Sequence, residues 1–398
     1  MVLAMSGLDY DRAPVALRER LSFTKNAVAD LDRALAGRPG VEGAVLLSTC
    51  NRTEVYLSGG VEALEPGALL CQAAGADYAL FAPAMVTRRG EDCVRHLMEV
   101  SCGLRSQILG EDQILTQVKT ALTLSREAGA ADGVLETLFR TAAACGKAGK
   151  SAGRLSAVGS SAAHQAAEAL ERALGPLTGK RVLVIGNGEM GRLAASLLRE
   201  AGCAVTVTLR SYRHGETIVP AGCAVAAYEE RYGAMEQAEA VVSATVSPHY
   251  TVAAAPFGAL KTKPRVLVDL AIPRDIQPEI GGEFPGVVLW NIDDLRPQGE
   301  ADSEALWRVR GTVEAHMERF RQWSVYRESL PALEEVKAAV LQRVRGLEAE
   351  EAAVRAVELL AGGLKAPLTQ EALRECAAKI RAHARGVRRA HDEVSPIY

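Results

Sequence analysis

A glycine-rich turn between an apolar run and an alanine- and leucine-rich segment constrains the fold of this chain more than any other feature. The apolar run occupies residues 181–185, the turn has the pattern G-x-G-x-x-G, and a helical pattern begins after it. This order of strand, turn and helix is typical of the first βαβ unit of a dinucleotide-binding sheet. The first glycine permits a tight bend, the second lets backbone N–H groups approach a pyrophosphate, and the third lets helix and strand pack closely. We predict that the turn binds a dinucleotide through Gly186, Asn187, Gly188, Glu189, Met190 and Gly191.

Further apolar, β-branched runs follow this turn and alternate with helical patterns. They lie at residues 204–209, 240–245, 265–270 and 287–290. Such alternation predicts a doubly wound parallel sheet, so we expect a Rossmann-type domain over about residues 160–295.

The first of these later runs ends in arginines and not in an acid. An Asp or Glu at this point would bind the 2′-hydroxyl of the adenosine ribose, whereas an arginine suits a 2′-phosphate. We therefore predict NADPH as the cofactor, with Arg210, Ser211 and Arg213 at its 2′-phosphate. The alternative is that these are solvated loop residues and that the cofactor is NAD.

A cysteine stands just beyond the apolar run 44–47, between small polar residues, and Asn51 and Arg52 follow it. A thiol becomes a nucleophile near neutral pH when a positive charge lowers its pKa, and Arg52 supplies that charge to Cys50 if its side chain folds back. A small hydrophobic residue at a strand end is the alternative. Together with a hydride carrier, a cysteine nucleophile suggests attack on an activated acyl group and reduction of the thioester to an aldehyde, or the reverse.

Two motifs in the first part of the chain resemble the glutamyl-tRNA reductase family. One runs from Leu47 to Tyr56 and contains Ser-Thr-Cys-Asn-Arg-Thr-Glu, and the other begins at Gly110 with Gly-Glu-Asp-Gln-Ile-Leu-Thr-Gln. The likeness continues at residues 13–19, 269–276 and 293–295, and covers about residues 1–295 well. The chain departs from the family's pattern at Asp9–Arg12, Arg105 and Leu209–Tyr212.

The resemblance implies an enzyme that reduces glutamyl-tRNA(Glu) to glutamate-1-semialdehyde with NADPH, the first step of five-carbon tetrapyrrole (5-aminolevulinate and haem) biosynthesis. Cys50 would form a glutamyl thioester, and His96 would assist protonation or orient the substrate. Arg52 would hold a substrate carboxylate in a bidentate fork. The implied substrate-binding residues are Thr49, Asn51, Arg52, Ser106, Glu111, Asp112, Gln113 and Gln117. The alternatives are a packing histidine and a polar helix N-terminus with Glu111 in its first turn.

After about residue 300 the pattern becomes that of long amphipathic helices. Apolar residues recur at three- and four-residue steps from Leu306 to Trp323, which predicts a helix over about 300–328 that Pro331 interrupts and a second helix from Leu333 to Leu347. In the family the long helix is a spine ahead of a dimerisation domain. The expected fold is therefore multidomain α/β: an α+β catalytic domain over 1–150, a Rossmann-type NADP domain over 160–295, and a spinal helix with an all-α dimerisation domain over 300–398, with a Gly- and Ser-rich hinge at 148–161.

Composition sets further bounds. The net charge of −3 means that tRNA affinity has to come from local basic groups, such as the cluster Lys379, Arg381, Arg385, Arg388 and Arg389. Eight cysteines without metal-ligand spacing, and apolar stretches of strand length only, predict reduced thiols, no metal, no membrane span and a cytoplasmic location. The family resemblance, and not the composition, implies a homodimer. The resemblance also suggests hand-over of the product to glutamate-1-semialdehyde aminomutase.

Two other functions stay open from the residues alone. One is an NADP-dependent dehydrogenase of small hydroxy or keto acids in which Cys50 is incidental. The other is a non-catalytic relative that binds tRNA, haem or a protein partner. The two catalytic-domain motifs argue against the first, and the presence of Cys50, Arg52, Glu111 and the whole glycine turn argues against the second.

Overall fold

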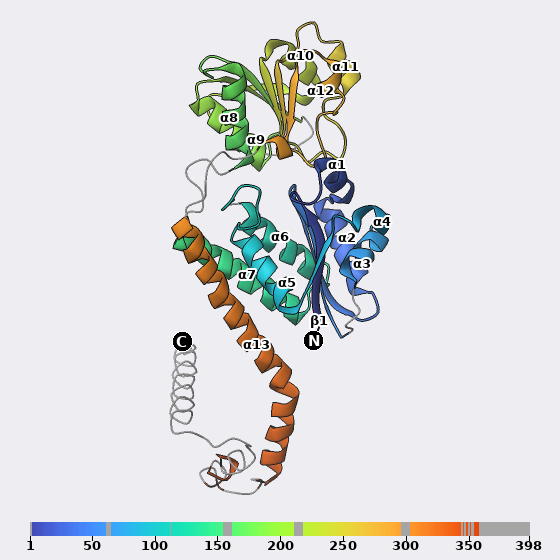
Figure 1. The fold of residues 1–398 in the computed structure, drawn as a ribbon, viewed down its shortest axis with the longest axis vertical. Helices are drawn as coiled ribbons and strands as arrows, with labels where there is room; N and C mark the ends of the chain where they lie inside the picture. The colour runs from blue at the N-terminus through green and yellow to red at the C-terminus, as the bar shows by residue number, and fades with distance from the viewer. Residues whose placement is uncertain are drawn as a thin grey trace, which may run out of the picture. The chain divides into compact units, whose positions relative to one another are not determined.

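The computed structural model describes residues 2–60, 65–111, 113–153, 161–210, 218–295 and 303–343, together with residues 345, 348, 351 and 354–357. Contacts divide the chain into two units, Met1–Gln322 and Trp323–Tyr398. The first unit contains two separate sheets, one antiparallel and one parallel (Figure 1).

The first sheet is antiparallel and has the strand order β2-β3-β1-β4. Helices α2, α3 and α4 lie on one side of it and α5, α6 and α7 on the other (Figure 1). Every residue of β3 is buried, as expected for a strand covered on both faces. The elements of this part are β1 (Val2–Asp9), α1 (Val15–Arg18), η1 (Glu19–Leu21), α2 (Lys25–Ala36), β2 (Val41–Ser48), β3 (Arg52–Gly59), α3 (Pro66–Ala73), α4 (Tyr78–Phe81), β4 (Val86–Arg89), α5 (Gly90–Ser101), α6 (Gln113–Glu127) and α7 (Gly133–Ala152).

The edge strand β2 is covered by side chains and a loop, so its outward backbone groups do not invite pairing with another chain. Asp32 of α2 accepts a hydrogen bond from the Leu46 N–H at 2.8 Å, and the Ser125 hydroxyl of α6 donates to the Ala44 carbonyl at 2.6 Å. The Ala44 N–H donates to the Ala130 carbonyl at 2.9 Å. These bonds hold β2 in place, which matters because this strand leads directly to Cys50.

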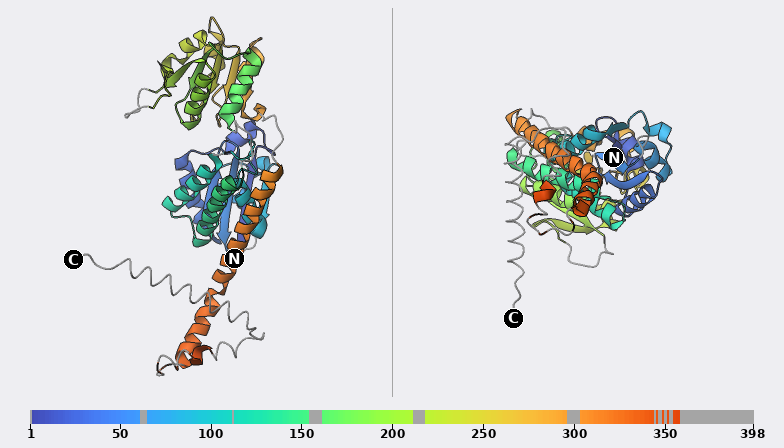
Figure 2. Two further views of the ribbon diagram at one scale, coloured as in Figure 1. Left: turned by 90° about the vertical axis from the view of Figure 1, so that its left-hand side faces the viewer. Right: turned by 90° about the horizontal axis from the view of Figure 1, so that it is seen from below.

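The second sheet is parallel throughout and has the strand order β10-β9-β8-β5-β6-β7. This is the doubly wound order with its switch point between β5 and β8, where ligands bind beyond the carboxyl ends of the strands. Figures 1 and 2 show helices on both faces of the sheet. Its elements are α8 (Ala162–Leu174), β5 (Arg181–Ile185), α9 (Glu189–Glu200), β6 (Ala204–Leu209), β7 (Ala224–Ala227), η2 (Tyr228–Glu230), α10 (Arg231–Gln237), β8 (Ala240–Ser243), α11 (Ala254–Gly258), β9 (Val266–Asp269), α12 (Ile280–Glu283), β10 (Val288–Asn291) and η3 (Ile292–Asp294).

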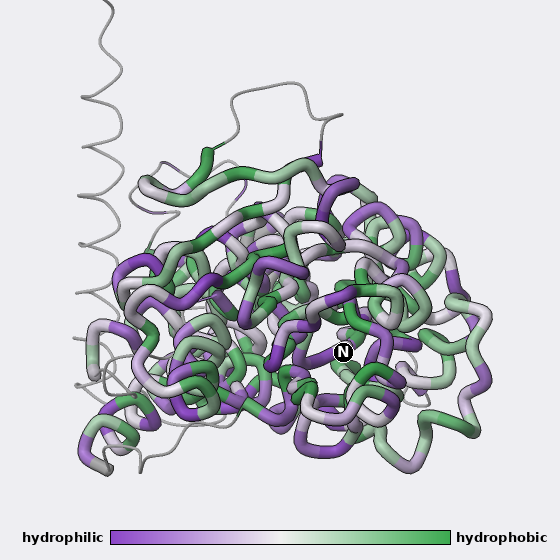
Figure 3. The backbone as a smooth tube through the Cα atoms, turned by 90° about the horizontal axis from the view of Figure 1, so that it is seen from above, coloured by the Kyte–Doolittle hydropathy of each residue, from purple (hydrophilic) through white to green (hydrophobic). Residues whose placement is uncertain are grey.

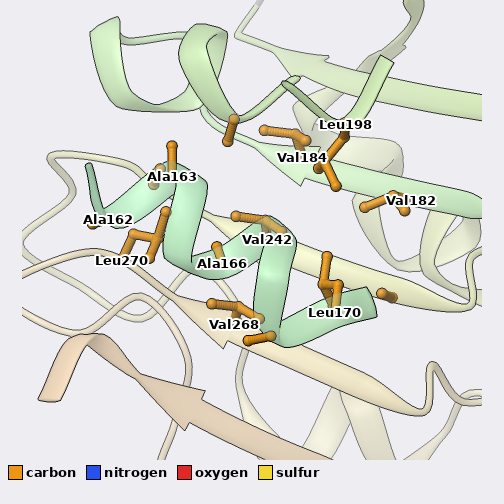
Figure 4. Close-up of a cluster of buried hydrophobic side chains, with 14 of the residues drawn as sticks. Ala162, Ala163, Ala166, Leu170, Val182, Val184, Leu198, Val242, Val268 and Leu270 are labelled. Atoms are coloured by element: carbon orange, nitrogen blue, oxygen red, sulfur yellow. The ribbon is translucent and has the colours of Figure 1, made fainter. Parts of the chain in front are cut away.

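The predicted parallel sheet is confirmed, and five of its six strands lie at the predicted apolar runs. Small residues of α8 let this helix approach the sheet closely: Ala162, Ala163 and Ala166 pack in one buried cluster with Val184 and Val242 (Figure 4). The patterns did not predict β7, because its four residues read Ala-Val-Ala-Ala and are exposed or half-buried.

A long helix, α13 (Ser303–Arg343), follows the second sheet and confirms the predicted long C-terminal helix. Within the first unit its stripe Val309, Val313, Met317 and Phe320 is buried. The predicted interruption at Pro331 is wrong, because the helix continues through this residue to Arg343. A proline removes only one N–H donor from the helix ladder, and here the surrounding turns remain helical.

The predictions for the C-terminal part of the chain lie mostly outside the described residues. The predicted second helix is described as far as Arg343, as the end of α13. The basic cluster at 379–389, the dimerisation domain beyond residue 357 and residues 154–160 of the predicted hinge are not described. In the part of the chain that is described, no helix is long and apolar enough to cross a membrane, and hydrophobic and hydrophilic residues alternate along the backbone (Figure 3).

The buried carboxyl group of Asp32 predicts a pH dependence of stability. Burial raises the pKa of Asp32 to about 8, against about 4 in an unfolded chain. Between these values the folded protein binds a proton that the unfolded chain releases, so the free energy of unfolding falls as the pH rises through this window. Asp32→Asn keeps an acceptor for the Leu46 N–H and does not titrate.

We expect Asp32→Asn to lose less stability than the wild type when the pH rises from about 5 to about 8. Urea unfolding of both proteins at these pH values measures the difference. Asp30→Asn, at an exposed carboxylate on the same helix, is the matched control and should follow the wild type. Equal pH dependence of Asp32→Asn and wild type would contradict the assignment.

Candidate functional site

The turn between β2 and β3 presents Cys50 at the end of a two-stranded arm. Pairing between the two strands ends with Ser48 opposite Thr53, which leaves the four residues from Thr49 to Arg52 between the paired positions. The Thr49 hydroxyl accepts hydrogen bonds from the N–H groups of Asn51 and Arg52, each at 3.2 Å, and the Thr49 N–H donates to the Arg52 carbonyl at 2.8 Å. Thr49 therefore shapes the turn through its own side chain, as hydroxyl residues do in such turns.

Cys50 is half-buried and lies against the core of the second sheet. Its side chain packs on the buried cluster that includes Val15 of α1 and Leu270 after β9. Burial, and to a smaller extent the carboxylate of Glu111, raise the pKa of the Cys50 thiol to about 12, although Arg18 and Arg52 act in the opposite direction. In this arrangement the thiol is neutral at physiological pH, and a group that offsets Glu111 would favour the thiolate.

Arg52 belongs to a buried network behind the turn. Its guanidinium donates to Glu54 Oε1 at 2.6 Å and also to the Arg105 carbonyl. Glu54 accepts two further bonds, from Tyr56 Oη to Oε2 at 2.6 Å and from His96 Nε2 to Oε1 at 2.9 Å. Burial opposes the charge on Glu54, but His96 and Arg52 together hold the pKa of this carboxyl well below its usual range.

In this network the side chains of Arg52 and His96 bind Glu54, although the sequence predicted that both contact the substrate. The Arg52 side chain is 1% exposed and pairs with Glu54, so a fork to a substrate carboxylate has to use its remaining N–H groups or displace Glu54. His96 bonds Glu54 through Nε2, and its Nδ1 is buried without a hydrogen-bond partner in the described part of the chain. The roles of Arg52 in substrate binding and of His96 in catalysis stay predictions.

The remaining predicted substrate-binding residues lie on the loop after α5 and at the start of α6. Gly103 and Gly110 close the neck of this loop: the Gly110 N–H donates to the Gly103 carbonyl at 3.1 Å, and a Cβ on Gly103 would come within 2.8 Å of the Gly110 Cα. Ser106 and Glu111 are buried. Gln113 and Gln117 are half-buried and lie one turn apart on α6. In the turn that carries Cys50, the Oδ1 atom of Asn51 is buried and has no hydrogen-bond partner among the described residues. Asp112 lies outside the described residues.

The predicted dinucleotide turn lies at the switch point of the second sheet. Gly186 has a φ of 105°, and a Cβ there would come within 2.6 Å of the Ala244 carbonyl oxygen. A Cβ on Gly191 would come within 2.0 Å of the Gly186 carbonyl oxygen, so the third glycine is required by packing. A Cβ on Gly188, in contrast, would meet no atom of the described chain within 4 Å, and the turn is open to a ligand at that residue.

The side chains around this turn supply further polar groups. Asn187 donates to the Ile218 carbonyl at 3.0 Å, and its Oδ1 is buried without a partner among the described residues. Arg210, after β6, stacks on the ring of Tyr228, with its Cζ atom 4.8 Å from the ring centroid. The Cζ atom of Arg231 lies 4.3 Å from the same centroid. Glu189 and Met190 begin α9. Ser211 and Arg213 lie outside the described residues.

Three residues near the site were not singled out from the sequence: Arg18, Glu54 and Asp293. Glu54 closes the cysteine motif, and the other two lie in segments that carry the family resemblance. No local pattern shows that Arg18 donates to the Cys50 carbonyl and pairs with Asp293, because the three residues are far apart in the chain. Arg105, a departure from the family's pattern, contributes its main-chain carbonyl to Arg52, while its side chain donates to Glu99 at 2.7 Å.

Comparison with known proteins finds similarity in both sheets. Residues 6–152 match the family model of the glutamyl-tRNA(Glu) reductase N-terminal domain, and residues 168–297 match the model of shikimate/quinate 5-dehydrogenase. A glutamyl-tRNA reductase of Acetivibrio thermocellus is 41% identical over 335 residues, which are 83% of this chain and 99% of that protein.

Two further matches differ in extent. A probable multifunctional siroheme biosynthesis protein of Ruminiclostridium josui is 41% identical over 326 residues, which are 81% of this chain but only 63% of that protein. The solved structure of glutamyl-tRNA reductase from Methanopyrus kandleri is 28% identical, covers 98% of both chains and has a TM-score of 0.44.

The charge of Glu111 beside Cys50 leads to a prediction about the thiol. Glu111→Gln removes a negative charge that raises the pKa of Cys50, so the pKa of the thiol should fall. The pH profile of Cys50 alkylation by iodoacetamide, followed by mass spectrometry of the Cys50 peptide, should shift to lower pH by about one unit. Glu127→Gln, at an exposed position on α6, is the control and should leave the profile unchanged. A shift to higher pH in Glu111→Gln would contradict the proximity of the two groups.

Proposed function

Because this chain belongs to the glutamyl-tRNA reductase family, we propose that it reduces glutamyl-tRNA(Glu) to glutamate-1-semialdehyde with NADPH, through a thioester on Cys50, as the first step of five-carbon tetrapyrrole biosynthesis. The observation that supports this most strongly is the position of Cys50. The thiol lies on a rigid turn, beside the charges of Glu111, Arg18 and Arg52, and packs against the core of a dinucleotide-type sheet. The nucleophile therefore lies next to the domain that would bind the hydride donor.

The first half-reaction uses residues of the antiparallel sheet and its helices. Sulfur attacks the glutamyl carbonyl carbon, a C–S bond forms, and the ester C–O bond breaks. The tRNA 3′-terminal ribose leaves as a free hydroxyl, with the thiol proton balancing the departing oxygen. The carboxylate of Glu111 suits the α-ammonium group of the substrate, and this pairing would offset the charge that raises the pKa of Cys50. Substrate binding would then itself favour the thiolate.

The network behind the turn would hold the substrate's carboxylate end. Glu54 fixes the guanidinium plane of Arg52, and Tyr56 and His96 fix Glu54 in turn. A buried, oriented arginine loses little further entropy when it binds a carboxylate. Thr49, Asn51, Ser106, Gln113 and Gln117 would supply neutral hydrogen-bonding groups around the glutamyl chain, and we propose Asp112 as part of the same pocket.

The residues of the second sheet fit a dinucleotide. Gly188 leaves room for a pyrophosphate at the N-terminus of α9, and the unpartnered Oδ1 of Asn187, among the described residues, is an acceptor in the same turn. When bound, a reduced nicotinamide would supply the hydride that converts the thioester to the aldehyde and releases Cys50 as the thiolate, which a proton from water returns to the thiol. We propose that Arg210, with Ser211 and Arg213, binds the 2′-phosphate of NADPH.

The organisation of the protein follows from the same proposal. We propose a catalytic domain over residues 1–150, an NADP domain over 160–295 and a helical dimerisation part over 300–398, in a cytoplasmic homodimer. The semialdehyde is reactive, so direct hand-over to glutamate-1-semialdehyde aminomutase would protect it. Size-exclusion chromatography with light scattering, with and without the aminomutase, tests both associations.

Replacing the nucleophile tests the function. The full chain, incubated with glutamyl-tRNA(Glu) and NADPH, should form glutamate-1-semialdehyde, and Cys50→Ser should lower this rate by at least about 10³-fold, since a hydroxyl is a poor nucleophile and returns only an ester. NADPH binding, measured by fluorescence, should be unchanged.

Cys223→Ser is the matched control, because Cys223 is a half-buried thiol of the second sheet that the mechanism does not use. It should turn over as the wild type does. Substantial semialdehyde formation by Cys50→Ser would rule out the thioester, and no product from the wild type would favour a non-catalytic relative.

Replacing Arg210 tests the cofactor. Arg210→Ala should raise the KM for NADPH by about tenfold or more and change the KM for NADH by less than about twofold, because only NADPH carries the 2′-phosphate. Arg265→Ala, at an exposed arginine before β9 at the other end of the sheet, should change neither value. Equal losses for the two cofactors would place the phosphate elsewhere.

A further inference from the structure

One buried arginine joins the cysteine turn to the second sheet. The Arg18 side chain is 2% exposed. Its Nε donates to the Ala13 carbonyl at 3.0 Å, Nη1 donates to the Cys50 carbonyl, and Nη2 pairs with the carboxylate of Asp293 after β10. The other carboxylate oxygen of Asp293 accepts the Val15 N–H at 2.9 Å. A single guanidinium therefore contacts both the catalytic turn and the cofactor domain.

The next residue makes a second bridge of opposite polarity. Glu19 accepts hydrogen bonds from Arg274 Nε at 2.9 Å and from Arg274 Nη2 at 2.5 Å, and also from the Arg274 N–H at 3.3 Å. Both side chains are less than one-fifth exposed. Arg18 and Glu19 are thus adjacent residues of opposite charge. Each pairs with an opposite charge at the carboxyl edge of the parallel sheet, Arg18 with Asp293 after β10 and Glu19 with Arg274 after β9. This alternation fixes the register of the contact as well as its affinity.

Neutral contacts surround these two bridges. Gln107 donates to the Ile292 carbonyl at 2.8 Å, and Val15 and Ile108 belong to the same buried cluster as Leu270. The contact is therefore partly desolvated, which strengthens the ion pairs and makes a missing partner costly. Because Arg18 binds the Cys50 carbonyl with the same guanidinium that binds Asp293, loss of the cofactor domain from this surface would leave the Arg18 charge beside the nucleophile without its carboxylate partner.

We propose that Arg18 is a positioning residue that couples docking of the cofactor domain to the orientation of the Cys50 turn, with Glu19 and Arg274 as the second point of the same contact. The inference rests on the proposed function, because it assumes that Cys50 carries the acyl group. Acyl transfer to Cys50 needs only groups of the antiparallel sheet and its helices, whereas reduction needs the thioester carbonyl to face the docked cofactor domain. The two half-reactions should therefore respond differently when the bridges are broken.

The experiment measures both half-reactions in the full-length protein. Acyl transfer is followed without NADPH as glutamyl label on the protein and free glutamate released, and reduction is followed with saturating NADPH as semialdehyde. Asp293→Asn should lower the rate of reduction by about tenfold or more while acyl transfer stays within about twofold. Arg18→Lys, which keeps the charge but has no planar fork to reach both partners, should behave in the same way.

Charge exchange separates a specific contact from a folding defect. Glu19→Arg and Arg274→Glu should each lower reduction by about tenfold, and the double variant, which restores opposite charges, should recover most of the wild-type rate. Arg20→Gln changes an exposed arginine of the same segment and should have no effect on either half-reaction. Thermal unfolding of each variant monitors the fold.

The outcomes are distinguishable from those that test the function. Wild-type rates of reduction in Asp293→Asn and in both single exchange variants would overturn the coupling while leaving the thioester mechanism intact. Equal loss of both half-reactions, without recovery in the double exchange variant, would also overturn it, since the residues would then serve only the fold. A wild-type protein that turns over but never carries glutamyl label would instead refute the proposed thioester.

Discussion

The buried charge of Glu54 organises the candidate site. A carboxylate inside a protein has to be compensated by donors, and here Arg52, Tyr56 and His96 supply them from β3 and α5. The same side chain also fixes the backbone around it: a Cβ on Gly7, the residue opposite Glu54 on β1, would come within 2.7 Å of the Glu54 Cα and Cγ atoms. Glu54 thus links β3 to β1 and to α5. Through Arg52 it also contacts the end of the turn that carries Cys50.

Most of the fold could be predicted from local patterns. The strands at the apolar runs, the glycine turn and the long helix depend on periodicity and on residues close in sequence, and they lie where the patterns place them. Two features could not be predicted in this way. The short strand β7 has no apolar run, and α13 passes through Pro331 although a proline usually ends a helix.

The residues of the candidate site also fall into a group that local patterns could predict and a group that they could not. Cys50 at the end of a strand, and Gln113 and Gln117 one turn apart on a helix, were predictable because each depends on neighbours in sequence. The partner of Arg52 was not, because the arginine was expected to face the substrate and the structure pairs it with Glu54. Arg18 and Asp293 meet only through the tertiary fold, and no spacing in the sequence could show it. Charges that are paired across distant segments are therefore the features that sequence reasoning misses here, and they include Arg18, which lowers the pKa of the thiol.

The central claim is that Cys50 carries the glutamyl group between tRNA and cofactor, and its most direct test is mass spectrometry of the Cys50 peptide. The wild-type protein is mixed with glutamyl-tRNA(Glu) in the absence of NADPH, quenched in acid and digested at low pH so that a thioester survives. The account predicts a peptide that is heavier by one glutamyl group and that loses this mass when NADPH is added before the quench. An unmodified Cys50 peptide, under conditions in which the same preparation forms semialdehyde with NADPH, would contradict the claim.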